Sequence, residues 1–139
     1  MTRDFAGAFP GAVPEIPVGN IDRTCEYYVR CLGFTLDWGG GPGGIAGLSR
    51  GQSRIFLTDP AFREMYGNQG PVLIWLNLGN RQEVDELHSE WTQREARIVS
   101  PPAAKPWNLY EFTAADPDGN LLRVFYDFAW ETRNPQGPG

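Results

Sequence analysis

Short apolar segments, separated by turns rich in glycine, proline and asparagine, recur along the chain and predict a β-rich fold. The segments with the composition of strands are 13–18, 34–38, 45–48, 54–58, 72–78, 98–99, 110–114 and 121–126. Between the last two, Asp116-Pro-Asp-Gly-Asn has the residues of a tight turn and predicts a hairpin. Pro101-Pro102 is expected to interrupt the segment that starts at Ile98, because proline cannot donate a ladder hydrogen bond.

Two segments have apolar residues at helical spacing. The first is expected to begin at Asp22, a good N-cap residue, and to end before Gly33. The residues predicted on its buried face are Cys25, Tyr28, Val29 and Leu32. The second helix is predicted over residues 83–96, and its buried stripe is Val84, Leu87 and Trp91.

The order of these elements repeats along the chain. Val18-Gly19-Asn20 matches Leu78-Gly79-Asn80 at an offset of 60, and a predicted helix follows each. Gly51 and the strand that ends at Asp59 match Gly119 and the strand that ends at Asp127, at an offset of 68. The repeat predicts an α+β fold of two βαβββ modules.

Composition and charge narrow the function classes. The net charge is −5, from 17 acidic and 12 basic residues, which argues against nucleic acid as a partner and permits a cationic ligand. The chain contains no apolar run of about 18 residues and no apolar signal core at its start, so we expect no membrane segment and a cytoplasmic location. Cys25 and Cys31 are six residues apart on one predicted helix, and we expect ordinary buried thiols rather than a disulfide.

Common catalytic motifs are missing from the sequence. It has no GxSxG, no glycine-rich loop that opens a helix, and a single histidine, His88, which we expect to be an exposed or half-exposed helical residue. Gly39–Gly44 lies between two predicted strands, which favours a flexible hairpin over a phosphate-binding loop. Asp116 and Asp118 are expected to cap their turn.

Several motifs resemble those of the vicinal oxygen chelate superfamily. They are Ile16-Pro17-Val18, Asn20-Ile21-Asp22, Tyr27-Tyr28, Cys31-Leu32-Gly33-Phe34, Glu111-Phe112 and Asp116-Pro-Asp-Gly-Asn. Within its glyoxalase/bleomycin resistance branch the chain is most similar to the bleomycin-binding resistance proteins. The narrower match lies in Val13-Pro14, Asp37-Trp38, Asp85-Glu86-Leu87, Glu90-Trp91 and Lys105-Pro106-Trp107. The resemblance covers residues 12–128.

The resemblance implies one domain over residues 1–139, built from two modules that each form a curled half-barrel. Module one is expected at 12–59, a connector at 60–70, module two at 71–128 and a tail at 129–139. It also implies a homodimer with two cavities. In such a dimer the arm of residues 1–11, with Phe5 and Phe9, could lie across the partner.

Metal-dependent members of the superfamily take their ligands from the first and last strand of each module. The resemblance transfers these positions to Val13, Ile55 (or Phe56), Leu73 and Arg123. Aliphatic and aromatic hydrocarbon side chains have no donor atom for a metal, and arginine is a permanent cation. We therefore expect no metal and no other cofactor.

Aromatic and acidic residues remain as candidates for ligand binding. By resemblance, Trp38 and Trp107 are expected to stack on a flat ligand, with Asp37 and Glu111 as charged or hydrogen-bonding partners. Phe34, Trp75, Tyr110 and Phe112 could line the cavity floor or the core, and the core role is favoured. Because side chains alternate along a strand, either Glu111 or its two aromatic neighbours face the cavity.

These expectations favour a binding protein over an enzyme. The first hypothesis is metal-free sequestration of a planar, cationic antibiotic of the bleomycin type, which would confer antibiotic resistance. The alternatives are a metal-dependent glyoxalase- or dioxygenase-like enzyme and a binder of another aromatic metabolite. The expected partners are a small aromatic ligand and a second copy of the chain, without nucleic acid or membrane.

Overall fold

The computed structural model describes residues 7, 9, 11–64, 70–129 and 131, and within them the predicted α+β fold is confirmed. The first module contains β1 (Glu15–Pro17), α1 (Ile21–Arg30), β2 (Thr35–Gly40), a 3-10 turn (Gly41–Gly43), β3 (Ile45–Arg50) and β4 (Ser53–Thr58). A short helix, α2 (Pro60–Arg63), follows. The second module contains β5 (Leu73–Asn77), α3 (Arg81–Gln93), β6 (Arg97–Ala104), β7 (Leu109–Ala115) and β8 (Leu121–Asp127). Phe5, part of the connector and most of the tail lie outside the described residues.

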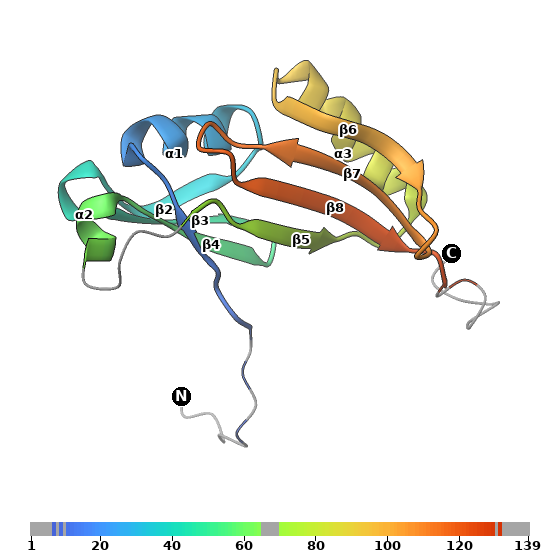
Figure 1. Cartoon of the computed structure of the whole chain (residues 1–139), viewed down its shortest axis with the longest axis horizontal. Coiled ribbons are helices and arrows are strands. Elements are labelled where there is room, and N and C mark those ends of the chain that lie inside the picture. The colour runs from blue at the N-terminus through green and yellow to red at the C-terminus, as the bar shows by residue number, and fades with distance from the viewer. Residues whose placement is uncertain (1–6, 8, 10, 65–69, 130, 132–139) are drawn as a thin grey trace.

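Each module builds one four-stranded mixed sheet, and the two sheets have the same topology. The strand orders are β1-β4-β3-β2 and β5-β8-β7-β6. The first strand of each module is parallel to the last, and the other neighbours are antiparallel. Neither sheet closes into a barrel. α1 packs on one face of the first sheet and α3 on one face of the second (Figure 1). We call the face of each sheet that is turned away from its helix the open face.

The repeat is visible at the start of both long helices. Asn20 caps α1 by accepting a hydrogen bond from the backbone N–H of Arg23 at 2.9 Å, and Asn80 caps α3 through Glu83 at 2.8 Å. The predicted cap at Asp22 is therefore wrong, because Asn20 already satisfies the first turn. The Asp22 carboxylate instead accepts a bond from the N–H of Gly41, at 2.9 Å, and ties the glycine-rich turn to α1.

The buried face of α1 follows from this earlier start. Its buried residues are Ile21, Thr24, Cys25 and Tyr28. Val29 is 40% exposed, so its predicted place on the buried face is wrong, since it lies about one hundred degrees around the helix from Tyr28. In α3, Val84 and Trp91 are buried as predicted. Both cysteines are buried and free, which confirms the prediction for them.

β6 runs through Pro101-Pro102, contrary to the predicted interruption. Its pairing with β7 shifts register between Ile98 and Ser100 and again between Ser100 and Ala103. β6 is the outer strand of its sheet, so the prolines need no partner on that side. Prolines and bulges on an edge strand also oppose pairing with another chain.

The turn between β7 and β8 joins the two modules. Asp118 accepts hydrogen bonds at 2.8 Å from the backbone N–H of Gly19 and from the hydroxyl of Thr24. The Asn120 side chain donates to the carbonyl of Pro17, also at 2.8 Å. Asp116 accepts bonds from the backbone N–H groups of Asp118 and Asn120, which confirms its predicted capping of this turn. The same prediction for Asp118 is wrong, because both of its carboxylate oxygens accept bonds from the first module. The turn therefore fixes the start of α1 against the second sheet.

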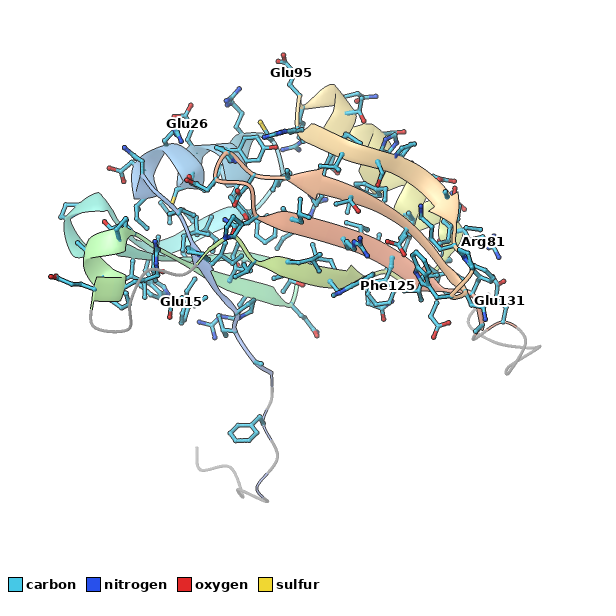
Figure 2. The ribbon with its side chains drawn as sticks, in the orientation of Figure 1. Glu15, Glu26, Arg81, Glu95, Phe125 and Glu131 are labelled. Atoms are coloured by element: carbon cyan, nitrogen blue, oxygen red, sulfur yellow. The ribbon has the colours of Figure 1, made fainter. Side chains whose placement is uncertain are left out.

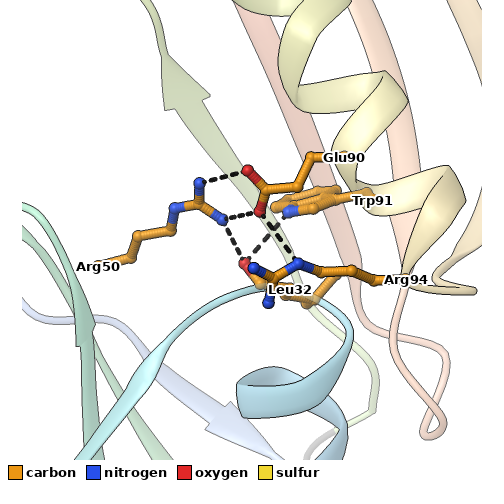
Figure 3. Close-up of polar contacts among 5 residues, drawn as sticks. All are labelled: Leu32, Arg50, Glu90, Trp91 and Arg94. Carbon is orange, nitrogen blue, oxygen red and sulfur yellow. Dashed lines mark hydrogen bonds and ion pairs between the residues drawn. The ribbon is translucent and has the colours of Figure 1, made fainter.

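A second polar junction lies between α1, β3 and α3 (Figure 3). Arg50 donates to both carboxylate oxygens of Glu90, at 2.7 and 3.0 Å, and to the carbonyl of Leu32 at 2.7 Å. The indole N–H of Trp91 donates to the same carbonyl at 3.1 Å, and Arg94 lies 3.6 Å from Glu90. The two junctions hold the modules together around one apolar core.

Glu90→Gln is expected to make the protein less sensitive to acid. The hydrogen bond from Arg50 lowers the pKa of Glu90, so its contribution to stability is present above the ordinary glutamate pKa of about 4.3 and is lost as the pH falls through the lower folded value. Urea unfolding between pH 2.5 and 7 would measure this, with the exposed Glu95→Gln as the charge-matched control. An equal acid response of wild type and Glu90→Gln would contradict it.

None of the helices in the described part of the chain is long and apolar enough to span a membrane.

Candidate functional site

The open face of the second sheet gathers side chains from β5, β7 and β8. Trp75 pairs with Arg123 across the parallel ladder, and Glu111 pairs with Phe125 across the antiparallel one. Alternation along β8 places Arg123 and Phe125 on one face and buried Val124 on the other. Phe125 projects from β8 and Glu15 from the first sheet (Figure 2). Four side chains of β5, β7 and β8 thus share this face.

Trp107 and Glu111, two predicted ligand residues, are in direct contact. Trp107 lies in the turn between β6 and β7, where Asn108 adopts a positive φ of 70°. The Trp107 indole N–H donates to Glu111 Oε1 at 2.7 Å. The indole remains 55% exposed, whereas Glu111 is only 3% exposed. Glu111 therefore holds Trp107 in place, and little of its own surface is available to a ligand.

Arg123 continues this contact toward β5. Its Nη1 atom is 3.8 Å from Glu111 Oε2, and its guanidinium carbon is 5.0 Å from the centre of the Trp75 ring. Trp75 packs edge-on against Phe125, with ring centres 5.5 Å apart. Trp75 is 43% exposed, so the core role favoured for it is wrong. Trp75, Arg123, Glu111 and Trp107 form one continuous chain of contacts, which we call the Trp75–Trp107 row.

Tyr110 and Phe112 lie on the opposite, helix-covered face of the sheet. Phe112 has no exposed surface and packs edge-on against Trp91 and His88, with ring centres 5.6 and 5.2 Å apart. The Tyr110 hydroxyl donates to Asp85 of α3 at 2.7 Å, and this bond raises the pKa of Tyr110. Phe112 is thus a core residue, and His88 is half-buried in the predicted helix.

Phe34 is also in the core, at 3% exposure, as its favoured role predicted.

On the first sheet, Trp38 lies on the open face above a glycine. Trp38 pairs with Gly47, and Gly47 pairs with Phe56. The indole crosses the glycine and packs edge-on against Phe56, with ring centres 5.1 Å apart, and is 42% exposed. Asp37 is exposed at an irregularity in the β2–β3 register, next to Trp38. The structure therefore places Trp38 and Asp37 on one sheet and Trp107 and Glu111 on the other.

Gly47→Ala is expected to displace the Trp38 indole with little loss of fold stability. A Cβ at position 47 would clash with Cε2 and Nε1 of the Trp38 indole, so the half-exposed ring must swing away. Near-ultraviolet circular dichroism and iodide quenching of tryptophan fluorescence would report the change. Gly43→Ala, where a Cβ meets nothing within 4 Å, is the control. An unchanged Trp38 environment in Gly47→Ala would contradict the described stacking.

The residues at the positions of the superfamily's metal ligands do not fit a metal. Glu15 pairs with Phe56 in the first sheet, as Trp75 pairs with Arg123 in the second, so the position equivalent to Arg123 is Phe56 and not Ile55. Ile55 is 1% exposed and belongs to the core. Among the described residues, no three His, Cys, Asp or Glu side chains are grouped to hold a metal ion.

Arg123 was not predicted as a ligand-facing residue, and for Trp75 the core was favoured over the cavity floor. The signal available in the sequence was a single arginine within an otherwise apolar segment, Leu121-Leu122-Arg123-Val124-Phe125. A charged residue at the centre of such a strand indicates that one face of the strand is open or that the charge has a dedicated partner.

Comparison with known proteins agrees with this architecture. The model of the Glyoxalase/Bleomycin resistance protein/Dioxygenase superfamily matches residues 12–124. No curated protein sequence matched the chain.

Three solved structures illustrate the range of similar folds. A glyoxalase/bleomycin resistance protein/dioxygenase from Nocardioides is 24% identical, with a TM-score of 0.70 over 86% of this chain and 84% of its own. The bleomycin-binding protein of bleomycin-producing Streptomyces verticillus, solved with copper(II)-bleomycin, is 25% identical, with a TM-score of 0.65 over 84% and 95%. A lactoylglutathione lyase from Agrobacterium tumefaciens is 18% identical, with a TM-score of 0.73 over 88% and 98%.

Proposed function

Because the chain belongs to the glyoxalase/bleomycin resistance protein/dioxygenase superfamily, we propose that it is a metal-independent binding protein for a planar aromatic small molecule. A bleomycin-type antibiotic is the first candidate ligand. The observation that carries the proposal is the Trp75–Trp107 row, where two indoles that are 43% and 55% exposed flank a fixed Glu111–Arg123 pair. Exposed aromatic rings beside a few oriented polar groups are typical of a small-molecule site.

Sequestration needs no chemical step. A protein that binds an antibiotic lowers the concentration of free drug by mass action, and resistance follows if the complex is tight and the protein abundant. Each stacked ring contributes about 0.5–1.5 kcal/mol beyond the burial of its area. Micromolar affinity corresponds to about 8 kcal/mol, so stacking on one or two indoles is not sufficient and the ligand must also bury a larger apolar surface.

A homodimer would supply that larger surface. The open faces leave Trp38 on the first sheet and Leu73 and Trp75 on the second more than 40% exposed, and apolar exposure of this kind favours a covering partner. We propose that an open face of one copy meets one of a second copy and encloses the ligand. Light scattering that gives only the 15.5 kDa species at micromolar concentration would contradict this assembly.

A titration with metal-free bleomycin tests the proposed function. Quenching of tryptophan fluorescence and binding heat are expected in wild type, and Trp107→Ala is expected to weaken binding about tenfold by removing one stacking platform. Val29→Ala, a 40% exposed position on α1, is the control and should bind as wild type does. No quench and no heat for bleomycin would exclude the first candidate ligand.

The rival hypothesis is a metal-dependent enzyme, in keeping with the fold of the lactoylglutathione lyase. It requires metal ligands from residues other than those at the superfamily positions. Elemental analysis of freshly purified protein separates the two, because stoichiometric zinc, nickel, manganese or iron would overturn metal-independent binding.

A further inference from the structure

The guanidinium group of Arg123 makes no hydrogen bond within the described part of the chain. Its Nε atom is buried without a partner, and among the described residues its one ion pair is with Glu111, whose Oε2 lies 3.8 Å from Nη1. That distance exceeds the range of a hydrogen bond. Arginine stays charged and carries five N–H donors, so an arginine without an acceptor is costly unless something else binds it.

Arg50 is an example of a guanidinium group whose N–H donors have acceptors within the protein. Arg50 is 36% exposed and makes three hydrogen bonds, two of them bidentate to Glu90. Arg123 has a similar exposure, 34%, and makes none with the residues that the structure describes. Glu111 does not take the role that Glu90 has for Arg50, because its Oε1 is turned to the Trp107 indole N–H and its Oε2 lies 3.8 Å from Arg123 Nη1. The donors of Arg123 are therefore left for a group from outside the described chain.

The surroundings of Arg123 favour a flat anion over a cation. Glu111 is 3% exposed and already lies beside a cation, so Arg123 is the charged group of the row that a ligand can reach. A carboxylate matches the fork of the guanidinium with two parallel hydrogen bonds. Trp75 is directly opposite Arg123 in the ladder, and the guanidinium carbon lies over its ring, 5.0 Å from the ring centre.

We propose that Arg123 binds the carboxylate of an aromatic acid, with the ring of the ligand against the exposed indoles of the Trp75–Trp107 row. This inference rests on the proposed small-molecule function, and for this face of the protein it names an aromatic acid as the ligand class in place of a bleomycin-type cation. It differs from the cationic ligand that the net charge permits, because the excess of acidic residues is a property of the whole chain and not of this face.

A matched pair of probes tests the ligand class. Wild type is expected to bind 2-naphthoate at least tenfold more tightly than the neutral isostere 2-naphthamide, because only the acid gives charge-assisted bonds to the guanidinium. The preference should shrink between 20 and 500 mM salt, since the pair is partly exposed. Calorimetry or tryptophan quenching measures both affinities.

Substitutions at Arg123 and at Glu111 should change the affinity for 2-naphthoate in opposite directions. Arg123→Gln is expected to remove the preference for the acid, and Arg123→Lys to keep part of it. Glu111→Gln is expected to raise the affinity for 2-naphthoate about threefold or more, since it removes a competing carboxylate while its amide oxygen can still accept from Trp107. Arg30→Gln, exposed on α1, makes the same change in net charge as Arg123→Gln and should leave binding unchanged.

The possible outcomes distinguish a failure of the carboxylate assignment from a failure of the proposed small-molecule binding function. Equal binding of 2-naphthoate and 2-naphthamide by wild type would overturn the carboxylate assignment and leave the small-molecule function standing. A loss of both affinities by the same factor in Arg123→Gln, Arg123→Lys and Glu111→Gln would show a structural role and would also overturn it. Failure of wild type to bind bleomycin and both naphthalene probes would overturn the inference and the proposed function together.

Discussion

Replacing Asp116 by alanine is expected to lower the free energy of unfolding by about 3–5 kcal/mol. The Asp116 carboxylate has no exposed surface and accepts hydrogen bonds from the Tyr28 hydroxyl at 2.8 Å and from Asn120 Nδ2 at 2.9 Å. It also accepts from the backbone N–H groups of Asp118 and Asn120. Alanine leaves the buried Tyr28 hydroxyl and both N–H groups without acceptors, and it loosens the turn that docks on α1. Urea unfolding at pH 7 measures the loss.

The Asp116→Asn variant shows how much of the stability loss comes from the negative charge and how much from the lost shape and hydrogen bonds of the side chain. Its remaining oxygen can still accept from the two backbone N–H groups, while its amide meets the Asn120 amide donor, so we expect a loss smaller than that of alanine. A loss in Asp116→Asn as large as that in Asp116→Ala would place the whole effect in the charge of the carboxylate.

The pH dependence of this difference has a defined sign. Burial raises the pKa of Asp116 above its ordinary value, although the hydrogen bonds from Asn120 and Tyr28 oppose the shift. The folded protein therefore keeps a proton that the unfolded chain has already lost. The part of the stability that comes from this retained proton is present in full below about pH 3.9 and decreases as the pH rises through the folded pKa, whereas the hydrogen bonds of Asp116 remain. The stability difference between wild type and Asp116→Asn should fall across that interval, and a rise would contradict the assignment.

The fold could be predicted from the sequence because its two halves repeat the same local signals. Gly19-Asn20 and Gly79-Asn80 both precede a helix, and in both the asparagine is the cap. The local sequence of the first helix does not separate the two caps, because aspartate and asparagine are equally suitable N-cap residues. The repeat already favoured Asn20, since Asn80 has no aspartate two residues later.

The register of the last strand of each module could not be predicted to the exact residue from the sequence. An offset of 68 aligned Arg123 with Ile55, but the ladders align it with Phe56. The two hairpin turns differ in length, so a single offset cannot hold across both the turn and the strand that follows. Because a shift of one residue exchanges the two faces of a strand, this small error decides whether a residue faces the core or the ligand.

The candidate site shows the same limit. Alternation predicted that Glu111 and its neighbours Tyr110 and Phe112 lie on opposite faces, which the structure bears out. Which face is open depends on the packing of α3, a tertiary contact that no local pattern contains. The contact of Arg123 with Trp75 depends on β5 pairing in parallel with β8, whose residues are about fifty positions away in the chain. Sequence reasoning therefore found the aromatic candidates but not the charged centre between them.

Truncation of Trp91 to alanine is expected to cost about 3–5 kcal/mol. Trp91 is 1% exposed, packs on Phe112, and donates through its indole N–H to the carbonyl of Leu32 in the other module. It also lines a groove of about 300 Å³ between the modules, together with Phe34 and Leu87. Alanine would enlarge this groove into the core and remove one hydrogen bond of the second polar junction. Urea unfolding, followed by circular dichroism, measures the loss.

Trp91→Phe divides this energy between packing and hydrogen bonding. Phenylalanine keeps an aromatic ring against Phe112 but has no N–H, and the Leu32 carbonyl still accepts the 2.7 Å bond from Arg50. No buried acceptor is left unpaired, so we expect Trp91→Phe to cost about 1–2 kcal/mol, well below the alanine variant. If Trp91→Phe were as destabilising as Trp91→Ala, the bond to Leu32, and not the packing of the ring, would be the main link between the two modules at this position.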